Sequence, residues 1–199
     1  MIPPLVLASG SPRRQELLSL LGVAFEAVPA EVGEEALPGE SAVGHVERLA
    51  LEKARWVAGR RPGAVVVGGD TVVVLDDEIL TKPASGADAV EMLLRLQGRT
   101  HRVETGIAVV APGGRAVSGV VGADVRFRPF DRATAEAYVA TGEPLDKAGS
   151  YGIQGRGSVL VDGINGDYYA IVGLPVARLM DLLAAVGFRY GFQGIQTTA

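Results

Sequence analysis

The chain contains no cysteine, which excludes disulfide bonds, thiolate metal ligands and catalytic thiols. It has two histidines, His45 and His101, whose separation does not match the ligand spacing of a structural zinc site. No apolar run reaches membrane-spanning length, and the first residues lack the charged and apolar regions of a signal peptide. We therefore expect a cytoplasmic protein that contacts no membrane.

An excess of positive charge is also missing. The chain has 19 Lys and Arg against 23 Asp and Glu, a formal net charge of −4. A negative protein has no broad attraction for nucleic acid, so we expect no nucleic-acid partner and infer that any polyanion it binds is small and held locally. The 199 residues, 48% of them hydrophobic and 21% charged, are ordinary for one folded domain or two closely packed lobes.

Apolar runs and helical periodicity predict a mixed α/β protein without the regular alternation of a plain Rossmann sheet. A single domain over residues 1–190 and a flexible tail over 191–199 are predicted. The predicted strands are 4–9, 23–28, a run from 63 that ends at Gly69 and Asp70 and continues as a hairpin through "DDE", 101–112 and 115–129. The predicted helices are 11–22, 42–59, 87–98, 131–142 and 175–186.

The stretch "SGSPRR" places Ser11 as an N-cap, Pro12 at the first helical position, and Arg13 and Arg14 in the first turn. Unpaired backbone N–H groups and the helix dipole make this end a cradle for phosphate or carboxylate. The same dipole disfavours two arginines unless an anion compensates them. The alternative is that both arginines are solvated and that "SGSP" is only a cap.

Two further residues carry charge where the surroundings are apolar. Asp70 follows the apolar run "AVVVGG", and it can act as a general base or a magnesium ligand, or serve simply as a turn residue. Lys53 falls on the apolar stripe that Val46, Leu49 and Ala50 form on the helix at 42–59. A lysine in that position either extends to solvent or meets an anion.

Three loop positions offer weaker signals. In "TKP", Pro83 restricts the backbone and orients Lys82, or the pair is an ordinary loop sequence before a helix. Glu34 and Glu35 can contribute to a metal site, or form a solvated acidic loop. Gln154 lies in "YGIQGRG", where an amide can match the edge of uracil or thymine and glycines allow a base to approach, or where the chain simply turns.

Taken together, these stretches resemble the Maf family of nucleoside triphosphate pyrophosphatases, the septum formation proteins. The resemblance runs through "LASGSPRRQELL", "LALEKA", "VVVGGDTVVVLDDEILTKP", "LLRLQGRTHRVETGIAVV" and "EPLDKAGSYGIQGRGSVLVDGINGDYYAIVGLP", in family order and over nearly the whole chain. It implies a fold like that of the inosine triphosphate pyrophosphatases, with a long twisted mixed sheet and two lobes flanking a nucleotide cleft. It also implies a homodimer.

The resemblance implies hydrolysis between the α and β phosphates, giving nucleoside monophosphate and pyrophosphate with a divalent cation, Mg²⁺ or Mn²⁺. Asp70 is then the proton acceptor for the attacking water and a metal ligand, with Glu34 as a further metal ligand. Many family members carry an acidic pair where this chain has Gly33 before Glu34. The positions that match those holding the substrate are Ser9, Arg13, Arg14, Lys53, Thr71, Lys82 and Gln154.

The "GGDT" and "YGIQG" motifs resemble the branch that acts on dTTP and UTP, whereas the 7-methyl-GTP branch has Gln after the aspartate and Glu in place of Gln154. Arg13, Thr71 and Gln154 are the specificity candidates. We expect an enzyme that removes excess or modified pyrimidine triphosphates, a house-cleaning role. The alternatives are a nucleotide-binding regulator of septum formation with little turnover, and a 7-methyl-GTP pyrophosphatase.

Overall fold

The computed structural model describes residues 3–192 and 194–198. Within these residues one sheet has the strand order β2-β1-β3-β5-β6-β7 with β4 paired to β3, and β8 and β9 form a second sheet. The strands are β1 (Leu5–Ala8), β2 (Phe25–Ala27), β3 (Val65–Leu75), β4 (Glu78–Leu80), β5 (Thr100–Val110), β6 (Ala116–Phe127), β7 (Val161–Gly166), β8 (Phe188–Tyr190) and β9 (Ile195–Thr197). The α-helices are α1 (Pro12–Ser19), α2 (Ala42–Ala58), α3 (Gly86–Leu96), α4 (Arg132–Val139), α5 (Tyr168–Val172) and α6 (Val176–Ala185), and the 3₁₀ helices are η1 (Glu143–Asp146), η2 (Ala148–Ser150) and η3 (Arg156–Leu160).

The chain divides into two units, and it passes from one to the other within β3, β5 and β6 and again after Val172. The first unit contains Met1–Asp70, Thr105–Val121 and Gly173–Ala199, and the second contains Thr71–Glu104 and Gly122–Val172. Strand β1 is parallel to β2 and β3, whereas β4 is antiparallel to β3 and β7 to β6. The predicted α/β class with a mixed sheet is confirmed. The single domain over 1–190 stays a prediction.

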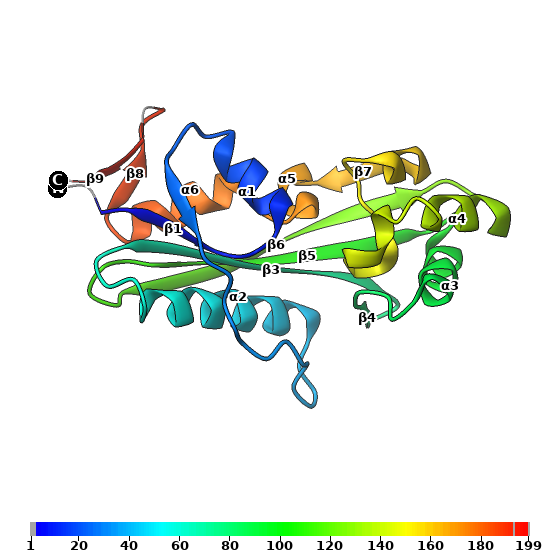
Figure 1. The fold of residues 1–199 in the computed structure, drawn as a ribbon, viewed down its shortest axis with the longest axis horizontal. Helices are drawn as coiled ribbons and strands as arrows, with labels where there is room; N and C mark the ends of the chain where they lie inside the picture. The colour runs from blue at the N-terminus through cyan, green and yellow to red at the C-terminus, as the bar shows by residue number, and fades with distance from the viewer. Residues whose placement is uncertain (1–2, 193, 199) are drawn as a thin grey trace. The chain divides into compact units, whose positions relative to one another are not determined.

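In the first unit, helix α2 lies along one face of the sheet, and α1 and α6 lie on the other (Figure 1). The face of α2 that meets the sheet carries His45, Val46, Leu49, Ala50, Lys53, Ala54 and Val57, all buried. Ala50, Ala54 and Val57 of this face belong to the same core cluster as Val6, Ala8 and Val66 of the strands. The predicted apolar stripe on this helix, with Lys53 as its one charged member among these residues, is therefore confirmed.

Two glycines allow α2 to lie directly on the backbone of the strands. A Cβ atom at Gly68 in β3 would lie 2.2 Å from the carbonyl oxygen of Ala50, and one at Gly106 in β5 would lie 2.1 Å from that of Val46. Real Cβ atoms do not come this close to a backbone oxygen. Only residues without a side chain fit at these two positions, and this close packing brings the side chains of α2 against the strands.

The expected end of the strand at Asp70 is wrong. Strand β3 continues to Leu75, because "TVVVL" is rich in β-branched residues that favour an extended chain. The parallel neighbour does stop at this level, since the register of β1 with β3 ends at Ala8 and Gly68. Asp70 therefore lies within a strand, but just past the carboxyl end of β1.

The second unit begins with the predicted hairpin. Asp76 and Asp77 join β3 to β4 with φ angles of 52° and 65°, which is the left-handed geometry that two-residue hairpin turns require. Helices α3 and α4 pack side by side in this unit (Figure 1). The short helix α5 was not predicted, because five residues within a glycine-rich stretch carry too little periodicity to indicate a helix.

Strand β9 lies within residues 191–199, for which a flexible tail is predicted. It pairs with β8 in antiparallel register, and the hydroxyl of Tyr190 donates to the carbonyl oxygen of Leu21 at 2.6 Å. Residues 193 and 199 lie outside the described residues, and the flexibility of the tail stays a prediction. None of the helices in residues 3–192 and 194–198 combines the length and apolar character needed to cross a bilayer.

A buried histidine ties two strands of the second unit to the loop that carries Tyr151. His101 in β5 shares a hydrogen bond of 2.8 Å between Nε2 and the hydroxyl of Tyr151, and its ring meets the edges of Tyr151 and Phe127. Burial lowers the pKa of His101 to about 4, and the carboxylate of Asp124 only partly opposes this. The imidazole is therefore neutral in the folded chain at physiological pH.

The close packing of α2 predicts that Gly106→Ala destabilises the first unit. The added methyl group forces helix and strand apart, and we expect a loss of about 2–3 kcal/mol in the free energy of unfolding. Urea unfolding followed by circular dichroism measures it. Gly59→Ala is the matched control, because Gly59 has a helical φ of −62° and a Cβ there would make only ordinary contacts. Equal stability of Gly106→Ala and Gly59→Ala would contradict the packing.

The pKa of His101 predicts a pH dependence of stability. Because the pKa is about 4 in the folded chain and about 6.5 when unfolded, the unfolded chain binds the proton more readily between these values. The free energy of unfolding therefore falls as the pH is lowered from about 6.5 towards 4, by about 2–3 kcal/mol from this residue. Comparing urea unfolding of the wild type and His101→Gln at pH 4.5, 5.5 and 7 isolates the contribution. The same pH slope in both proteins would show that His101 does not cause it.

Candidate active site

A buried lysine joins two carboxylates in the first unit. The ammonium Nζ of Lys53 lies 2.8 Å from Oδ1 of Asp70 and 2.5 Å from Oε1 of Glu34. Lys53 is 7% exposed and Asp70 9%, whereas the side chain of Glu34 is half-exposed. The carboxylate oxygens of Asp70 and Glu34 thus lie within two hydrogen-bond lengths of each other. The structure decides between the two readings of Lys53: it meets anions rather than extending to solvent.

The "GGD" sequence explains how these groups come together. Successive residues of a strand point to opposite faces, so Gly68 and Asp70 face one side and Gly69 the other. Gly68 admits α2, which brings Lys53 to Asp70 on the same face. On the other face, a Cβ at Gly69 would lie 3.2 Å from Nε of Arg14, closer than an ordinary contact. The two glycines therefore admit different neighbours, α2 and an arginine.

Arg14 is held by groups from distant parts of the sequence. Its Nε donates to the carbonyl oxygen of Gly173 at 2.7 Å, and its Nη1 donates to Oγ of Ser9 at 3.2 Å. Burial lowers the pKa of Arg14 from its usual value, and the nearby carboxylates of Asp70 and Glu34 oppose that shift. A guanidinium with so high a starting pKa remains charged. Arg14 is thus a fixed positive charge beside Asp70.

The amino-terminal end of α1 has the features expected of an anion site. Ser11 is the N-cap and Pro12 opens the helix as predicted, but the hydroxyl of Ser11 makes no capping hydrogen bond. The first turn contains no acidic residue, and it carries Arg13 and Arg14 instead. The backbone N–H of Ser11 donates to Oγ of buried Ser9 at 3.2 Å. This end concentrates positive charge in a first turn that has no acidic residue.

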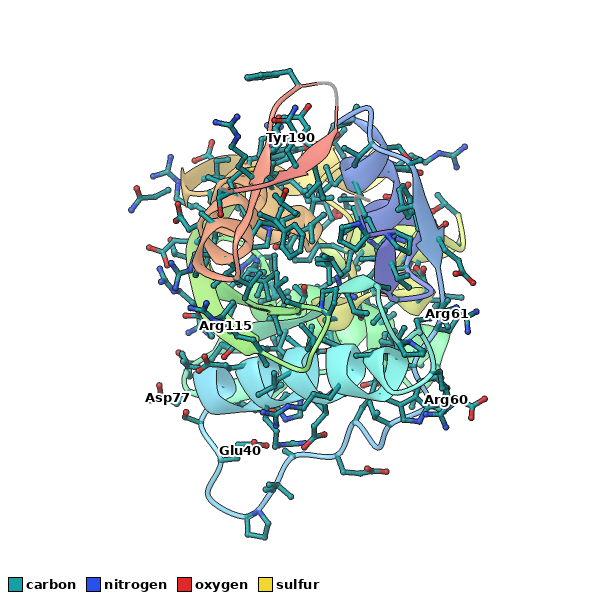
Figure 2. All side chains as sticks on the ribbon, turned by 90° about the vertical axis from the view of Figure 1, so that its left-hand side faces the viewer. Glu40, Arg60, Arg61, Asp77, Arg115 and Tyr190 are labelled. Atoms are coloured by element: carbon teal, nitrogen blue, oxygen red, sulfur yellow. The ribbon has the colours of Figure 1, made fainter. Side chains whose placement is uncertain are left out.

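The loop that bears Glu34 is held at its far end by an ion pair. Arg48 on α2 donates through Nε and Nη2 to the carboxylate of Glu40, at 2.6 and 2.8 Å, and through Nη2 to the backbone carbonyl of Glu35 at 3.1 Å. Nδ1 of His45 lies 3.0 Å from the same carboxylate. Figure 2 shows Glu40 on the loop that runs beneath α2. These contacts lower the pKa of Glu40, chiefly through Arg48, so the anchor is ionic at neutral pH.

The remaining predicted residues belong to the second unit. Thr71 follows Asp70 in β3 and is half-buried. Lys82 is exposed in the segment between β4 and α3, and Gln154 is exposed in the loop between η2 and η3. The convergence of Thr71, Lys82 and Gln154 with the cluster around Asp70 stays a prediction.

Comparison with known proteins decides the family. A family model described as "Maf-like protein" matches residues 4–186. The chain belongs to the Maf family. A protein named dTTP/UTP pyrophosphatase from Symbiobacterium thermophilum is 51% identical over 184 residues, covering 92% of this chain and 94% of its own length. A protein of the same name from Moorella thermoacetica is 53% identical over 186 residues, covering 92% of this chain and 95% of its own length. Another from Bacillus cereus is 48% identical over 176 residues, covering 88% of this chain and 92% of its own length.

Among solved structures, a nucleoside-triphosphatase/dITP/XTP pyrophosphatase from Mycobacterium abscessus matches with a TM-score of 0.44 and 18% sequence identity. The match covers 92% of this chain and 97% of that one.

Every predicted site residue lies within the Maf match, and the structure brings several of them together in the first unit. These are Ser9, Arg14, Lys53, Asp70 and Glu34, with Arg13 beside Arg14 on α1. In residues 3–192 and 194–198 no group of three or more histidine, aspartate and glutamate side chains is placed to hold a metal ion.

Sequence reasoning missed the carbonyl of Gly173 and the anchor between Glu40 and Arg48. Gly173 lies 159 residues from Arg14 in the sequence. Every residue has a backbone carbonyl, so the residue type does not indicate which carbonyl accepts this hydrogen bond. Its φ of 118° is the conformation that favours glycine, so the glycine in "GLP" is the only local signal. Glu40 and Arg48 lie on a loop and the helix that follows it, where charged residues usually face solvent.

The ion pair predicts that Lys53→Met destabilises the Maf fold, because it leaves the buried Asp70 carboxylate without its ammonium. We expect a loss of about 2–4 kcal/mol in the free energy of unfolding at pH 7.5, and a smaller loss in Lys53→Met/Asp70→Asn. Urea unfolding of the two single variants and the double variant measures the coupling. Arg95→Met is the control: it breaks an exposed pair with Glu78, and little change is expected. A wild-type midpoint for Lys53→Met would contradict this account.

Proposed function

We propose that this chain is a nucleoside triphosphate pyrophosphatase that hydrolyses dTTP and UTP to the nucleoside monophosphate and pyrophosphate. One observation supports the activity above all: relatives about half identical over about nine-tenths of both chains are named dTTP/UTP pyrophosphatase. The charged cluster of the first unit supplies the groups that such a reaction requires. Catalysis of phosphoryl transfer depends on positioning the reactants and on neutralising negative charge.

We assign the triphosphate to the positive groups at the start of α1. The first turn presents backbone N–H groups and two guanidiniums, and Ser9 adds a hydroxyl beside Arg14. Gly173 fixes the guanidinium of Arg14 through Nε, so the side chain is positioned before substrate arrives. Lys82 is assigned to the same triphosphate by family resemblance.

We assign Asp70 as the general base. Water attacks the α-phosphorus, the bond from that phosphorus to the α,β-bridging oxygen breaks, and pyrophosphate leaves with its electron pair. The proton of the water passes to the carboxylate of Asp70. Lys53 binds Oδ1 of that carboxylate and so orients it, and the proton is assigned to Oδ2. Arg14 stabilises the charge that develops on the phosphate oxygens.

We also propose a divalent cation, Mg²⁺ or Mn²⁺, held by Asp70 and Glu34. The donor set suits such an ion, because Mg²⁺ is commonly bound by one or two carboxylates together with substrate phosphates. Glu34 is exposed on the loop that Glu40 anchors, so it can approach a ligand without disturbing the core. When bound, the cation would supply positive charge to the α and β phosphate oxygens.

Thr71 and Gln154, with Arg13, are assigned to the choice of substrate. The exposed amide of Gln154 offers a donor and an acceptor, which match the O4 and N3–H of thymine or uracil. Removal of modified pyrimidine triphosphates would follow from the same recognition, in keeping with a house-cleaning role. The homodimer and the cytoplasmic location expected from the sequence stay predictions.

A nucleotide panel with product identification tests the proposal. With Mg²⁺, we expect dTTP and UTP to give the monophosphate and pyrophosphate, and H₂¹⁸O to label the monophosphate. Asp70→Asn should lower kcat about 100-fold or more. Asp181→Asn, the same change at an exposed position of α6, is the control.

The other outcomes separate the alternatives. Release of orthophosphate would contradict cleavage between the α and β phosphates. Tight nucleotide binding without turnover would favour the regulator of septum formation, and a preference for 7-methyl-GTP would assign the chain to the other Maf branch.

A further inference from the structure

The loop that carries Gln154 packs around one carboxylate. Glu143 opens η1, and its two carboxylate oxygens accept hydrogen bonds from the backbone beyond Gln154. Oε2 accepts from the N–H of Arg156 at 2.9 Å, and Oε1 accepts from the N–H of Gly157 at 3.0 Å. Glu143 therefore holds the chain on the carboxyl side of Gln154.

Tyr138 on α4 holds the other side. Its hydroxyl donates to Oε1 of Glu143 at 2.9 Å and accepts from the N–H of Gly152 at 3.0 Å. Tyr138 is buried, and burial raises the pKa of its hydroxyl, which therefore keeps its proton and can donate. Gln154 thus lies between two backbone segments that are tied to the same pair of side chains.

Gly155 and Gly157 of "YGIQGRG" lie so close to the side chains of Glu143 and Tyr138 that no larger residue fits without displacement. A Cβ at Gly155 would lie 2.6 Å from Oε2 of Glu143, and one at Gly157 would lie 2.5 Å from the hydroxyl of Tyr138 and 2.6 Å from the carbonyl oxygen of Gly152. Any larger residue would push the loop off the carboxylate. The loop is therefore a closely fitted turn, and the recognition of a base by Gln154 stays a prediction.

The site also requires a carboxylate rather than an amide. An ionised carboxylate only accepts hydrogen bonds, and three donors converge on this one. Burial would raise the pKa of Glu143, but the N–H groups of Gly157 and Arg156 and the hydroxyl of Tyr138 together lower it, so the group is ionised at neutral pH. Nζ of Lys147 adds a hydrogen bond of 2.5 Å to the backbone carbonyl of Glu143.

We propose that Glu143 is a positioning residue for base recognition: with Tyr138, it fixes the loop 152–157 so that the amide of Gln154 is presented to the pyrimidine. This inference rests on the proposed function for its ligand. Glu143 does not touch the nucleotide in this account. Its contribution is to the part of the affinity that depends on the base, and not to the part that depends on the triphosphate.

Two probes separate those parts. One is dTTP in which nitrogen replaces the α,β-bridging oxygen, so that it binds without turnover, and the other is inorganic tripolyphosphate. The ratio used here is the dissociation constant of tripolyphosphate divided by that of the dTTP analogue. Measured by calorimetry with Mg²⁺, it reports the contribution of the nucleoside to the affinity. We expect Glu143→Gln and Tyr138→Phe each to reduce this ratio about tenfold, because they displace the amide that reads the base. Tripolyphosphate affinity should be unchanged.

A double-variant cycle tests whether the effect acts through Gln154. In the Gln154→Ala background, Glu143→Gln should reduce the ratio no further. Glu136→Gln on α4 and Tyr169→Phe are matched controls, since both residues are exposed, and each should keep the wild-type ratio. Circular dichroism establishes that the variants are folded, and Tyr138→Phe provides a second test if Glu143→Gln does not fold.

The inference would be overturned by an unchanged ratio in Glu143→Gln and Tyr138→Phe, whether or not both probes bind more weakly, or by an effect that adds to that of Gln154→Ala. A wild-type ratio equal to that of Gln154→Ala would overturn it too. Failure of the proposed function is a separate result, because it shows as an absence of turnover with dTTP and UTP while both probes still report binding.

Discussion

The ion pair between Lys53 and Asp70 is the interaction on which the rest of the first unit depends. An ammonium and a carboxylate taken out of water each carry a large desolvation cost, which is offset only by good geometry and close partners. Here the partners lie 2.8 Å apart, Glu34 supplies a second carboxylate, and Arg14 lies on the other face of β3. The unit therefore keeps buried charged groups next to its apolar core.

Glycine is the device that allows this arrangement in both units. Gly68 and Gly106 let α2 approach the strands, and Gly155 and Gly157 let a loop close around the side chains of Glu143 and Tyr138. Each position gives up the packing and the backbone restriction that a side chain would supply. In return, helix, strand and loop backbones approach closely, and polar side chains are held in fixed positions between them.

The charge of the molecule is organised locally rather than globally. A net charge of −4 gives no general affinity for polyanions. The first turn of α1 nevertheless has two arginines and no acidic residue, so positive charge is concentrated in one small region of a negatively charged chain.

The sequence by itself determined the α/β class, the five longer α-helices, strands β1 to β6, the helix start at Pro12, the lysine on the apolar stripe of α2, and the resemblance to the Maf family. Those features are local or periodic, and both periodicity and helix capping can be recognised from the order of residues. Only the tertiary structure decided that Lys53 meets Asp70 and Glu34, that Gly173 holds Arg14, that β3 continues past Asp70, and that Glu143 supports the loop of Gln154. Each of these depends on contacts between residues far apart in sequence or on a backbone acceptor, and neither leaves a pattern in the order of side chains.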